Sequence, residues 1–184
     1  MDAWVWIVIV AVVAVLVVLA LAVVASRKRR TSHLRETFGS EYDRTVAESD
    51  KRQDAEQELL DREKRHDELD IRPLSPAART RFGEEWSAVQ AQFVDDPEGA
   101  VRSADVLVVR VMEERGYPSN GDADRRAADL SVEHADVVGQ YRRGHALVEG
   151  SDEAEDGTES LRQAMKCFRT AFEELLEDRS KATA

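Results

Sequence analysis

The chain has 184 residues, with 26 Lys and Arg against 37 Asp and Glu, which gives a formal net charge of −11. Proteins that bind nucleic acid neutralise phosphates with basic side chains, so this acidic balance argues against a DNA or RNA partner. The single cysteine, Cys167, excludes a disulfide within the chain and a zinc site built from cysteines.

Residues 3–25 consist only of Ala, Val, Leu, Ile and Trp. At about 1.5 Å per residue, a helix of this length exceeds the ~30 Å hydrocarbon core of a bilayer. A single segment in lipid must satisfy its own backbone hydrogen bonds, which only a helix achieves. The sequence therefore predicts a transmembrane helix within an anchor at residues 1–30.

Aromatic and basic residues flank this segment at opposite ends. The residues expected at the membrane interface are Trp4, Trp6, Arg27, Lys28, Arg29 and Arg30. The positive-inside rule places the N-terminus outside and residues 26–184 in the cytoplasm. The basic run is expected to contact membrane lipid as a topology determinant, and a specific lipid or nucleic-acid site is the alternative.

A cleaved signal peptide is the alternative to a retained anchor, since Ala22 and Ala25 are small residues before Ser26. A signal peptide carries positive charge before a shorter apolar core, whereas here the basic cluster follows the core. We therefore expect the anchor to be retained.

Residues 31–72 are predicted to form a charged helical stalk. Gly39 should break or bend a helix that continues from the membrane, and Ser40 is a candidate N-cap. No Gly or Pro follows until after Asp70, so one helix of about 46 Å is expected there. Large apolar residues are too sparse for a self-standing coiled coil.

The region from Pro73 to residue 178 is predicted to be a compact antiparallel bundle of about four helices. Ser75 and Asp96 each precede a proline, which is typical of an N-cap and a first helical turn. Apolar residues recur at helical spacing in four stripes. These stripes contain Phe82, Trp86, Val89 and Phe93; Val101, Ala104, Leu107, Val108, Val111 and Met112; Val137, Val138, Tyr141, His145 and Val148; and Leu161, Ala164, Met165, Phe168, Phe172 and Leu175.

The connections in this region are also predicted. Gly116 is a candidate C-cap, a short helix is expected over 123–130, and residues 150–157 should form a loop. Thr158 is a candidate cap for the last helix, and residues 179–184 form a tail. The expected fold class is all-α, with an anchor, a stalk and a bundle.

Four groups of residues are distinctive: residues 33–46 (HLRETFGSEYDRTV), residues 70–75 (DIRPLS), Trp86 with residues 89–90 and 93–97, and residues 115–118 (RGYP). In these segments the chain resembles an uncharacterised family of actinobacterial single-pass membrane-anchored proteins. The resemblance covers nearly the whole chain. It implies the anchored architecture and carries no activity, cofactor or catalytic residue.

The histidines and the cysteine are weak candidates for chemistry. His134 and His145 would stand about 16 Å apart along one helix, too far to bind one metal, and we expect His134 at the surface and His145 in or beside the core. Glu63-x-x-His66 has the spacing of half a di-iron motif, but no second copy occurs. Cys167 is expected to be a buried or half-buried small side chain.

No catalytic, cofactor-binding or metal-binding residue is assigned from the sequence. Tyr117 and Pro118 are candidate partner contacts, and the alternative for Tyr117 is a ring that folds onto the core after helix termination. The predicted function is that of a membrane-anchored, non-catalytic interaction or scaffold protein that presents a cytoplasmic bundle to membrane lipid and an unidentified protein partner. The alternatives are an exported binding module of the envelope and an enzyme with an unrecognised site.

Overall fold

A computed structural model describes residues 3–150 and 157–177, without the side chains at positions 3, 5 and 7–11. These residues form helices and no strands, as the all-α prediction expects. The helices are α1 (Ala3–Phe38), α2 (Ser40–Glu48), α3 (Arg52–Asp67), α4 (Pro76–Gln92), α5 (Pro97–Arg115), α6 (Ala123–Leu130), α7 (Ala135–Glu149) and α8 (Gly157–Glu177). The predicted tail and most of the predicted 150–157 loop lie outside the described residues.

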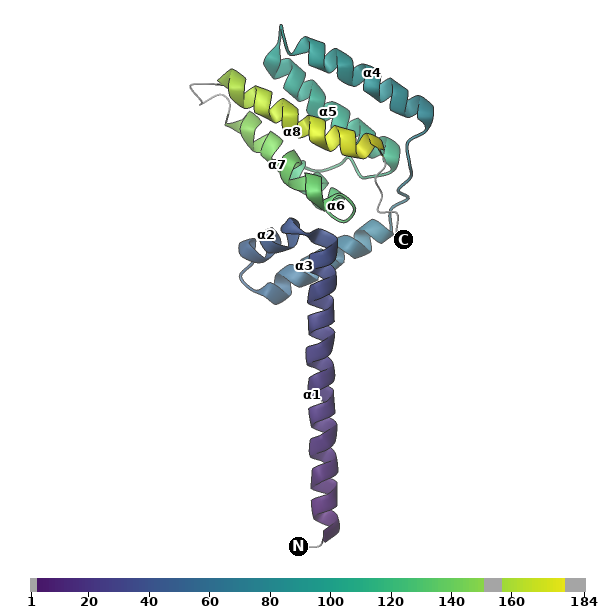
Figure 1. Cartoon of the computed structure of the whole chain (residues 1–184), viewed down its shortest axis with the longest axis vertical. Helices are drawn as coiled ribbons and strands as arrows, with labels where there is room; N and C mark the ends of the chain where they lie inside the picture. The colour runs from purple at the N-terminus through teal and green to yellow at the C-terminus, as the bar shows by residue number, and fades with distance from the viewer. Residues whose placement is uncertain (1–2, 151–156, 178–184) are drawn as a thin grey trace.

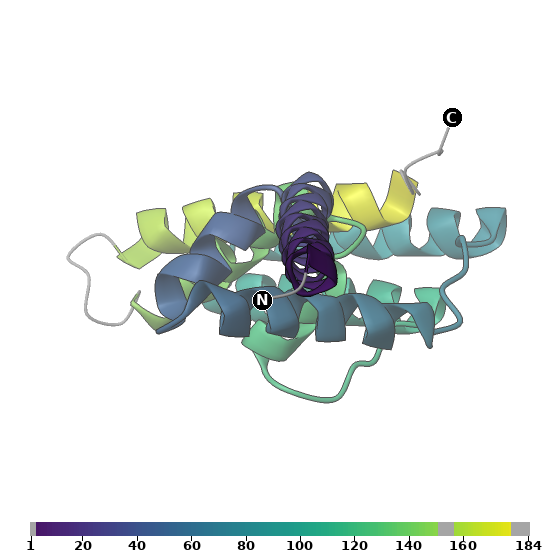
Figure 2. The same cartoon turned by 90° about the horizontal axis from the view of Figure 1, so that it is seen from below.

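The molecule has the shape of a helical rod with a globular head. Helix α1 projects from the head along the long axis, and the bundle helices lie across that axis (Figure 1). Seen from below, α1 stands near the middle of the head (Figure 2). Helices α2 and α3 lie between the rod and the bundle (Figure 1).

The bundle contains the main hydrophobic core, which draws on α4, α5, α7 and α8, with the short α6 packed on α7. The aromatic side chains predicted for the inner stripes meet there. Trp86 of α4 stacks on Phe172 of α8, with 4.6 Å between ring centres. Phe168 packs edge-on against Tyr141, at 5.9 Å. The four long helices and the short 123–130 helix of the bundle are thus as predicted, but Thr158 lies inside α8, which already includes Gly157, so the predicted cap at Thr158 is wrong.

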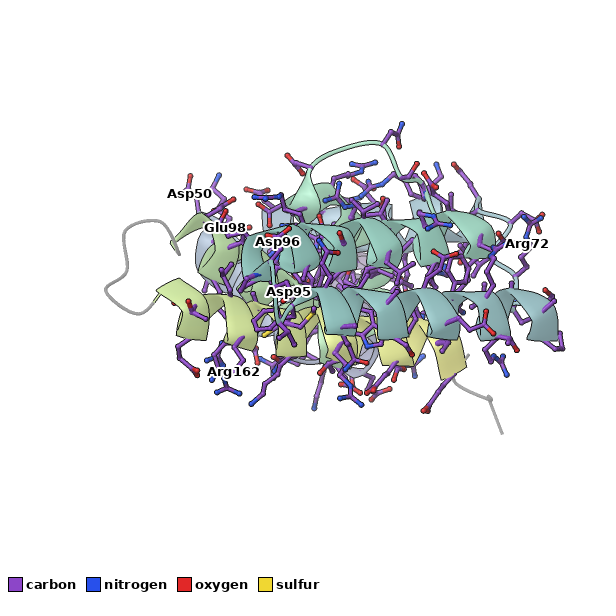
Figure 3. The ribbon with its side chains drawn as sticks, turned by 90° about the horizontal axis from the view of Figure 1, so that it is seen from above. Asp50, Arg72, Asp95, Asp96, Glu98 and Arg162 are labelled. Atoms are coloured by element: carbon purple, nitrogen blue, oxygen red, sulfur yellow. The ribbon has the colours of Figure 1, made fainter. Side chains whose placement is uncertain are left out.

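Local signals in the sequence mark the helix ends of the bundle. Ser75 and Asp96 accept hydrogen bonds from the backbone of the first turns of α4 and α5, which confirms both predicted N-caps. Gly116 ends α5 in the left-handed region, with φ of 98°. Figure 3 shows Asp95 and Asp96 together with Glu98 at the α4–α5 turn, and Arg72 at the opposite end of the bundle.

The predicted stalk differs most from the structure. Helix α1 continues to Phe38, and Gly39 breaks it as expected, but Ser40 is the first residue of α2 and makes no side-chain cap. Residues 49–51 then interrupt the single helix expected over 40–70, so that α2 and α3 fold back on each other. The pair also contacts α1, α6 and α7.

This folded pair buries the few apolar residues that the stalk region contains. Leu34, Phe38, Tyr42 and Leu59 form a second, smaller core. A straight helix would have left Tyr42 and Leu59 in solvent, whereas the hairpin buries both fully. At the interruption the Ser49 hydroxyl donates to the carbonyl of Thr45 at 2.8 Å, a local bond that competes with helix continuation.

Candidate functional site

The apolar part of α1 is exposed along its described length. Trp4 and Trp6 are 64% and 57% exposed. The large apolar side chains that follow are also exposed: Val12, Val13, Val15, Leu16, Val17, Val18, Leu19, Leu21, Val23 and Val24. Among the residues that the structure describes, no helix combines the length and the apolar character needed to cross a membrane. A contiguous exposed apolar surface marks an interaction site with a lipid or protein partner.

The part of the fold between the apolar portion of α1 and the bundle, which we call the basal unit, comprises residues 27–67. It contains the charged end of α1 together with α2 and α3, and its smaller core is the one built around Tyr42. Because the unit lies between the apolar part of α1 and the bundle, it determines how the two are connected (Figure 1).

The basal unit contains a basic cleft of about 880 Å³ between α1 and the first turns of α3. The charged residues of its lining are Arg27, Lys28, Arg30, Arg35, Arg52, Asp54 and Glu56. Basic residues outnumber acidic ones here, although the chain as a whole is acidic. Three of the four residues of the predicted basic flank line the cleft, and the fourth, Arg29, is exposed outside the lining.

Glu56 at the inner wall of the cleft is held by neighbouring side chains. Its Oε1 accepts hydrogen bonds from the Thr31 hydroxyl at 2.8 Å, the Tyr42 hydroxyl at 3.0 Å and Arg52 Nε at 3.0 Å. Burial alone would raise the pKa of Glu56, but these hydrogen bonds outweigh it, and the pKa lies below its ordinary value. The Nε of Arg30 lies 4.0 Å from Glu56 Oε2 and, although buried, has no hydrogen bond.

The first junction between the basal unit and the bundle centres on Glu41 of α2, which is 3% exposed. Arg142 of α7 donates to its two carboxylate oxygens at 2.8 and 2.7 Å. Within the basal unit, Arg44 Nε donates to the same carboxylate at 3.0 Å and Arg62 Nη1 at 3.5 Å. The second acidic partners of Arg142, Arg44 and Arg62 are Asp124, Glu48 and Glu58, respectively. The buried carboxylate thus ties three helices together.

A second junction links α3 to the turn before α7. His66 Nε2 lies 3.7 Å from Glu133 Oε1, and the Tyr117 hydroxyl donates to Glu133 Oε2 at 2.6 Å. The interaction with His66 and the Tyr117 hydrogen bond outweigh burial and bring the pKa of Glu133 to about 2. The carboxylate therefore keeps its charge well into the acidic range.

His134 lies beside this junction and is 2% exposed, so the predicted surface position is wrong. Helix α7 begins at Ala135, and His134 precedes it as the N-cap residue, where its ring turns toward α8. The Nδ1 of His134 lies 3.4 Å from Glu174 Oε1, and Nε2 lies 3.5 Å from Arg115 Nη1. Burial and the Arg115 guanidinium lower the pKa of His134, against the opposing effect of Glu174.

Tyr117 and Pro118, the candidate partner contacts, follow the end of α5. Tyr117 is 3% exposed and belongs to the main core, and Pro118 is half-buried. The Arg115 guanidinium lies over the Tyr117 ring at 5.9 Å. This burial removes the tyrosine ring from the surface that a partner could reach and agrees with the alternative of a ring folded onto the core.

His145 lies against Asp105 inside the bundle. Its Nε2 lies 3.1 Å from Asp105 Oδ1, and the Tyr141 hydroxyl donates to the same oxygen at 3.1 Å. Burial alone would raise the pKa of Asp105, but the effects of His145 and Arg126 together outweigh burial, so the pKa lies below its ordinary value. The His145 ring packs edge-on against Tyr141 and Phe168, at 4.8 and 5.1 Å. The predicted place of His145 in or beside the core is confirmed, and these contacts are those of a packed structural pair.

Cys167 and the Glu63-x-x-His66 motif, the remaining candidates for chemistry, do not come together in one site. Cys167 is buried as predicted, and burial raises the pKa of its thiol. Glu63 contacts His33 of α1 at 2.7 Å, whereas His66 contacts the bundle through Glu133, so the two residues of the Glu63-x-x-His66 motif face different partners. Over the described residues, no three His, Cys, Asp or Glu side chains are grouped as a metal site.

The bundle surface contains a shallow groove between α4 and α8, with a volume of about 180 Å³. Trp86, Phe93 and Met165 supply its apolar lining, and Lys166 and Arg162 are among its polar residues. Arg162 projects at the edge of α8 (Figure 3). We call this feature the α4–α8 groove.

Comparisons of the chain with protein-family models, with curated proteins and with solved structures gave no match. The residues and contacts described above are therefore the basis for the proposed function.

Sequence reasoning missed the Glu41 junction, because its partners come from distant parts of the chain. One signal could have pointed to it. Arg142 follows Val138 by four residues, which places a charged side chain beside the inner apolar stripe of α7. A charge at such a position needs a buried partner.

Proposed function

We propose that this protein is a membrane-anchored, non-catalytic interaction protein that presents its helical bundle at the cytoplasmic face of the membrane. The observation that carries the proposal is the exposed apolar part of α1, which leads directly into the basic flank. No chemistry is required of such a protein, since anchoring alone raises the local concentration of the bundle near a partner at the membrane.

The dimensions of α1 support a membrane anchor. The 36 residues of α1 give a rod of about 54 Å at 1.5 Å per residue. Residues 3–25 contain no charged residue, and at about 34 Å they match the ~30 Å hydrocarbon core. Trp4 and Trp6 at one end and the basic flank at the other fit the two interfaces of a bilayer.

The structure of the basal unit is consistent with the proposal that the bundle is held close to the membrane. Glu41 and Glu133 attach α2 and α3 to the bundle at two separate junctions. Because α1 passes into the basal unit without interruption as far as Phe38, the bundle is expected to sit directly above the headgroups. A partner would therefore meet the bundle at a nearly fixed height.

The α4–α8 groove is the part of the bundle that best supports a protein contact, because it combines apolar and cationic side chains. A photoreactive amino acid at position 166, in the groove, should crosslink a partner in intact membranes. The same amino acid at the exposed Val106, on another face, should not. Equal crosslinking from both positions would contradict a contact at the groove.

Resistance of the full chain to alkaline carbonate extraction tests the membrane anchor. Val12→Arg with Leu16→Arg should release the chain, because each arginine costs about 2.5–3.5 kcal/mol at the centre of a membrane helix. The matched control is Val94→Arg with Val106→Arg in the bundle. All four residues are exposed, at 52%, 59%, 82% and 57%, respectively. Equal extraction of the two variants would contradict the anchor.

A further inference from the structure

We propose that the cleft between α1 and α3 binds the phosphate group of an anionic phospholipid. The proposal rests on the proposed membrane anchor, because the anchor places the cleft at the surface of the bilayer. It goes further in one respect: the basic residues form a defined binding site for one headgroup, in addition to setting the orientation of the protein.

The position of the cleft along α1 fits this ligand. Arg27 follows Ala25 by two residues and Arg30 by five, which places them about 3 and 7.5 Å beyond the end of the apolar segment. The headgroup region extends roughly 5–7 Å beyond the hydrocarbon core on each side. Arg27 and Arg30 are therefore at the depth at which lipid phosphates lie.

The chemistry of the lining favours phosphate. Arginine is suited to bidentate recognition of phosphate oxygens, and Arg27 and Arg30 both line the cleft. The Nε of Arg30 is buried without a hydrogen bond. The Glu56 carboxylate already accepts bonds from three other side chains, which limits its ability to neutralise the cations at the mouth of the cleft.

The start of α3 adds to the positive potential. Its first residue, Arg52, lines the cleft together with Gln53 and Asp54. Asp54 in the first turn offsets part of the positive end of the helix dipole, so the cation that α3 contributes to the cleft is Arg52. A phosphate between α1 and α3 would meet cationic groups from both helices.

The neighbouring Arg29 allows a site to be distinguished from general attraction to an anionic surface. Arg29 has the same charge and nearly the same depth as Arg30, but it is exposed and does not line the cleft. Attraction to the surface alone predicts equal contributions from Arg29 and Arg30. A site in the cleft predicts that Arg30 matters and Arg29 does not.

Native mass spectrometry of the full chain in detergent micelles measures this directly. The micelles are titrated with phosphatidylglycerol or, separately, with phosphatidylcholine. The wild-type chain should retain one phosphatidylglycerol in preference to phosphatidylcholine. Arg30→Gln should weaken retention about fivefold, the loss expected for one basic residue near a membrane surface, and Arg29→Gln should stay within about twofold of wild type. Glycerol 3-phosphate and inorganic phosphate are added as soluble competitors.

The outcomes separate the two proposals. Equal losses for Arg29→Gln and Arg30→Gln, or no preference for phosphatidylglycerol, would overturn the lipid site. Complete displacement by millimolar inorganic phosphate would assign the cleft to a free phosphate and overturn the lipid as its ligand. Carbonate extraction of the same variants from vesicles reports the anchor independently. A chain that stays in the membrane without lipid preference refutes only the site, whereas a chain that is extracted refutes the anchor and the lipid site with it.

Discussion

Glu41→Gln is the substitution that most directly probes how the basal unit is attached to the bundle. Glu41 is buried and contacts three arginines, and the substitution removes its charge while keeping nearly the same shape. Removing one member of a buried ion pair typically costs about 3–5 kcal/mol, because the partner charge is left uncompensated. Here each arginine keeps a second acidic partner, so we expect a smaller cost, of about 2–4 kcal/mol.

Hydrogen–deuterium exchange of the full chain in micelles is the suitable assay, because it reports local opening of α2 and α3 separately from the bundle. A cost of about 2–4 kcal/mol corresponds to exchange roughly 30- to 900-fold faster for the protected amides of α2 and α3. The amides of α5 and α8 should change much less, since their main core does not include Glu41.

Glu48→Gln is the matched control for this prediction. Glu48 lies on the same helix and pairs with Arg44, one of the arginines that bind Glu41, but its side chain is 59% exposed. Exposed ion pairs contribute about 0–1 kcal/mol, so exchange should accelerate no more than about fivefold. Glu41→Gln with exchange close to wild type, or the same acceleration from both substitutions, would refute the attachment through Glu41.

Three further predictions concern the bundle, each measured by urea unfolding of the full chain in micelles. Because the pKa of His134 is lowered in the folded state, the free energy of unfolding should fall as pH decreases below about 6.5, by at most ~1.4 kcal/mol per pH unit. His134→Gln should flatten this slope, and an unchanged slope would contradict the burial of a neutral imidazole. Phe172→Ala should cost about 3–5 kcal/mol, because it removes the ring that stacks on Trp86; a cost below about 1 kcal/mol would be inconsistent with that stack. Gly116→Ala should destabilise by about 1–3 kcal/mol, since φ is 98° and the new Cβ would meet the carbonyl oxygen of Asp70 at 2.2 Å. The control Gly83→Ala, in an open helical position, should be neutral or stabilise by up to ~1 kcal/mol. A larger loss of stability for Gly83→Ala than for Gly116→Ala would refute the strained cap.

The sequence predicts the bundle well because its signals are local. A cap followed by proline at Ser75 and Asp96 and a glycine at position 116 mark helix ends through bonds within a few residues. The stripes that contain Trp86 and Phe172 follow the helical repeat, so their inward faces can be predicted without the partner helix.

The basal unit could not be predicted in the same way, because its structure depends on contacts between distant residues. Few apolar residues occur between 40 and 70, and a long charged helix is the reading that local propensity favours. The hairpin is stable because Tyr42 and Leu59 meet Leu34 of α1 in a shared core. That core forms only when all three helices come together.

Among the candidate sites, too, those built from neighbouring residues could be predicted from the sequence and those built from distant residues could not. The basic flank at residues 27–30 consists of four adjacent basic residues in the sequence, and three of the four line the cleft. The Glu41 junction joins residues 101 positions apart, so the local pattern around Arg142 can indicate that a buried partner is needed but not which residue supplies it. His134 is expected at the surface from the sequence, but it precedes α7 as the N-cap residue and contacts Glu174 of α8, a distant residue that no local pattern indicates.

The topology of the C-terminus tests the central claim most directly. An epitope tag is placed after residue 184, and a bulky protease is added either to intact spheroplasts or to inside-out membrane vesicles. A cytoplasmic bundle on a membrane anchor predicts that the tag survives in spheroplasts and is lost from the vesicles. Loss of the tag in intact spheroplasts, with a cytoplasmic marker protein still protected, would contradict it.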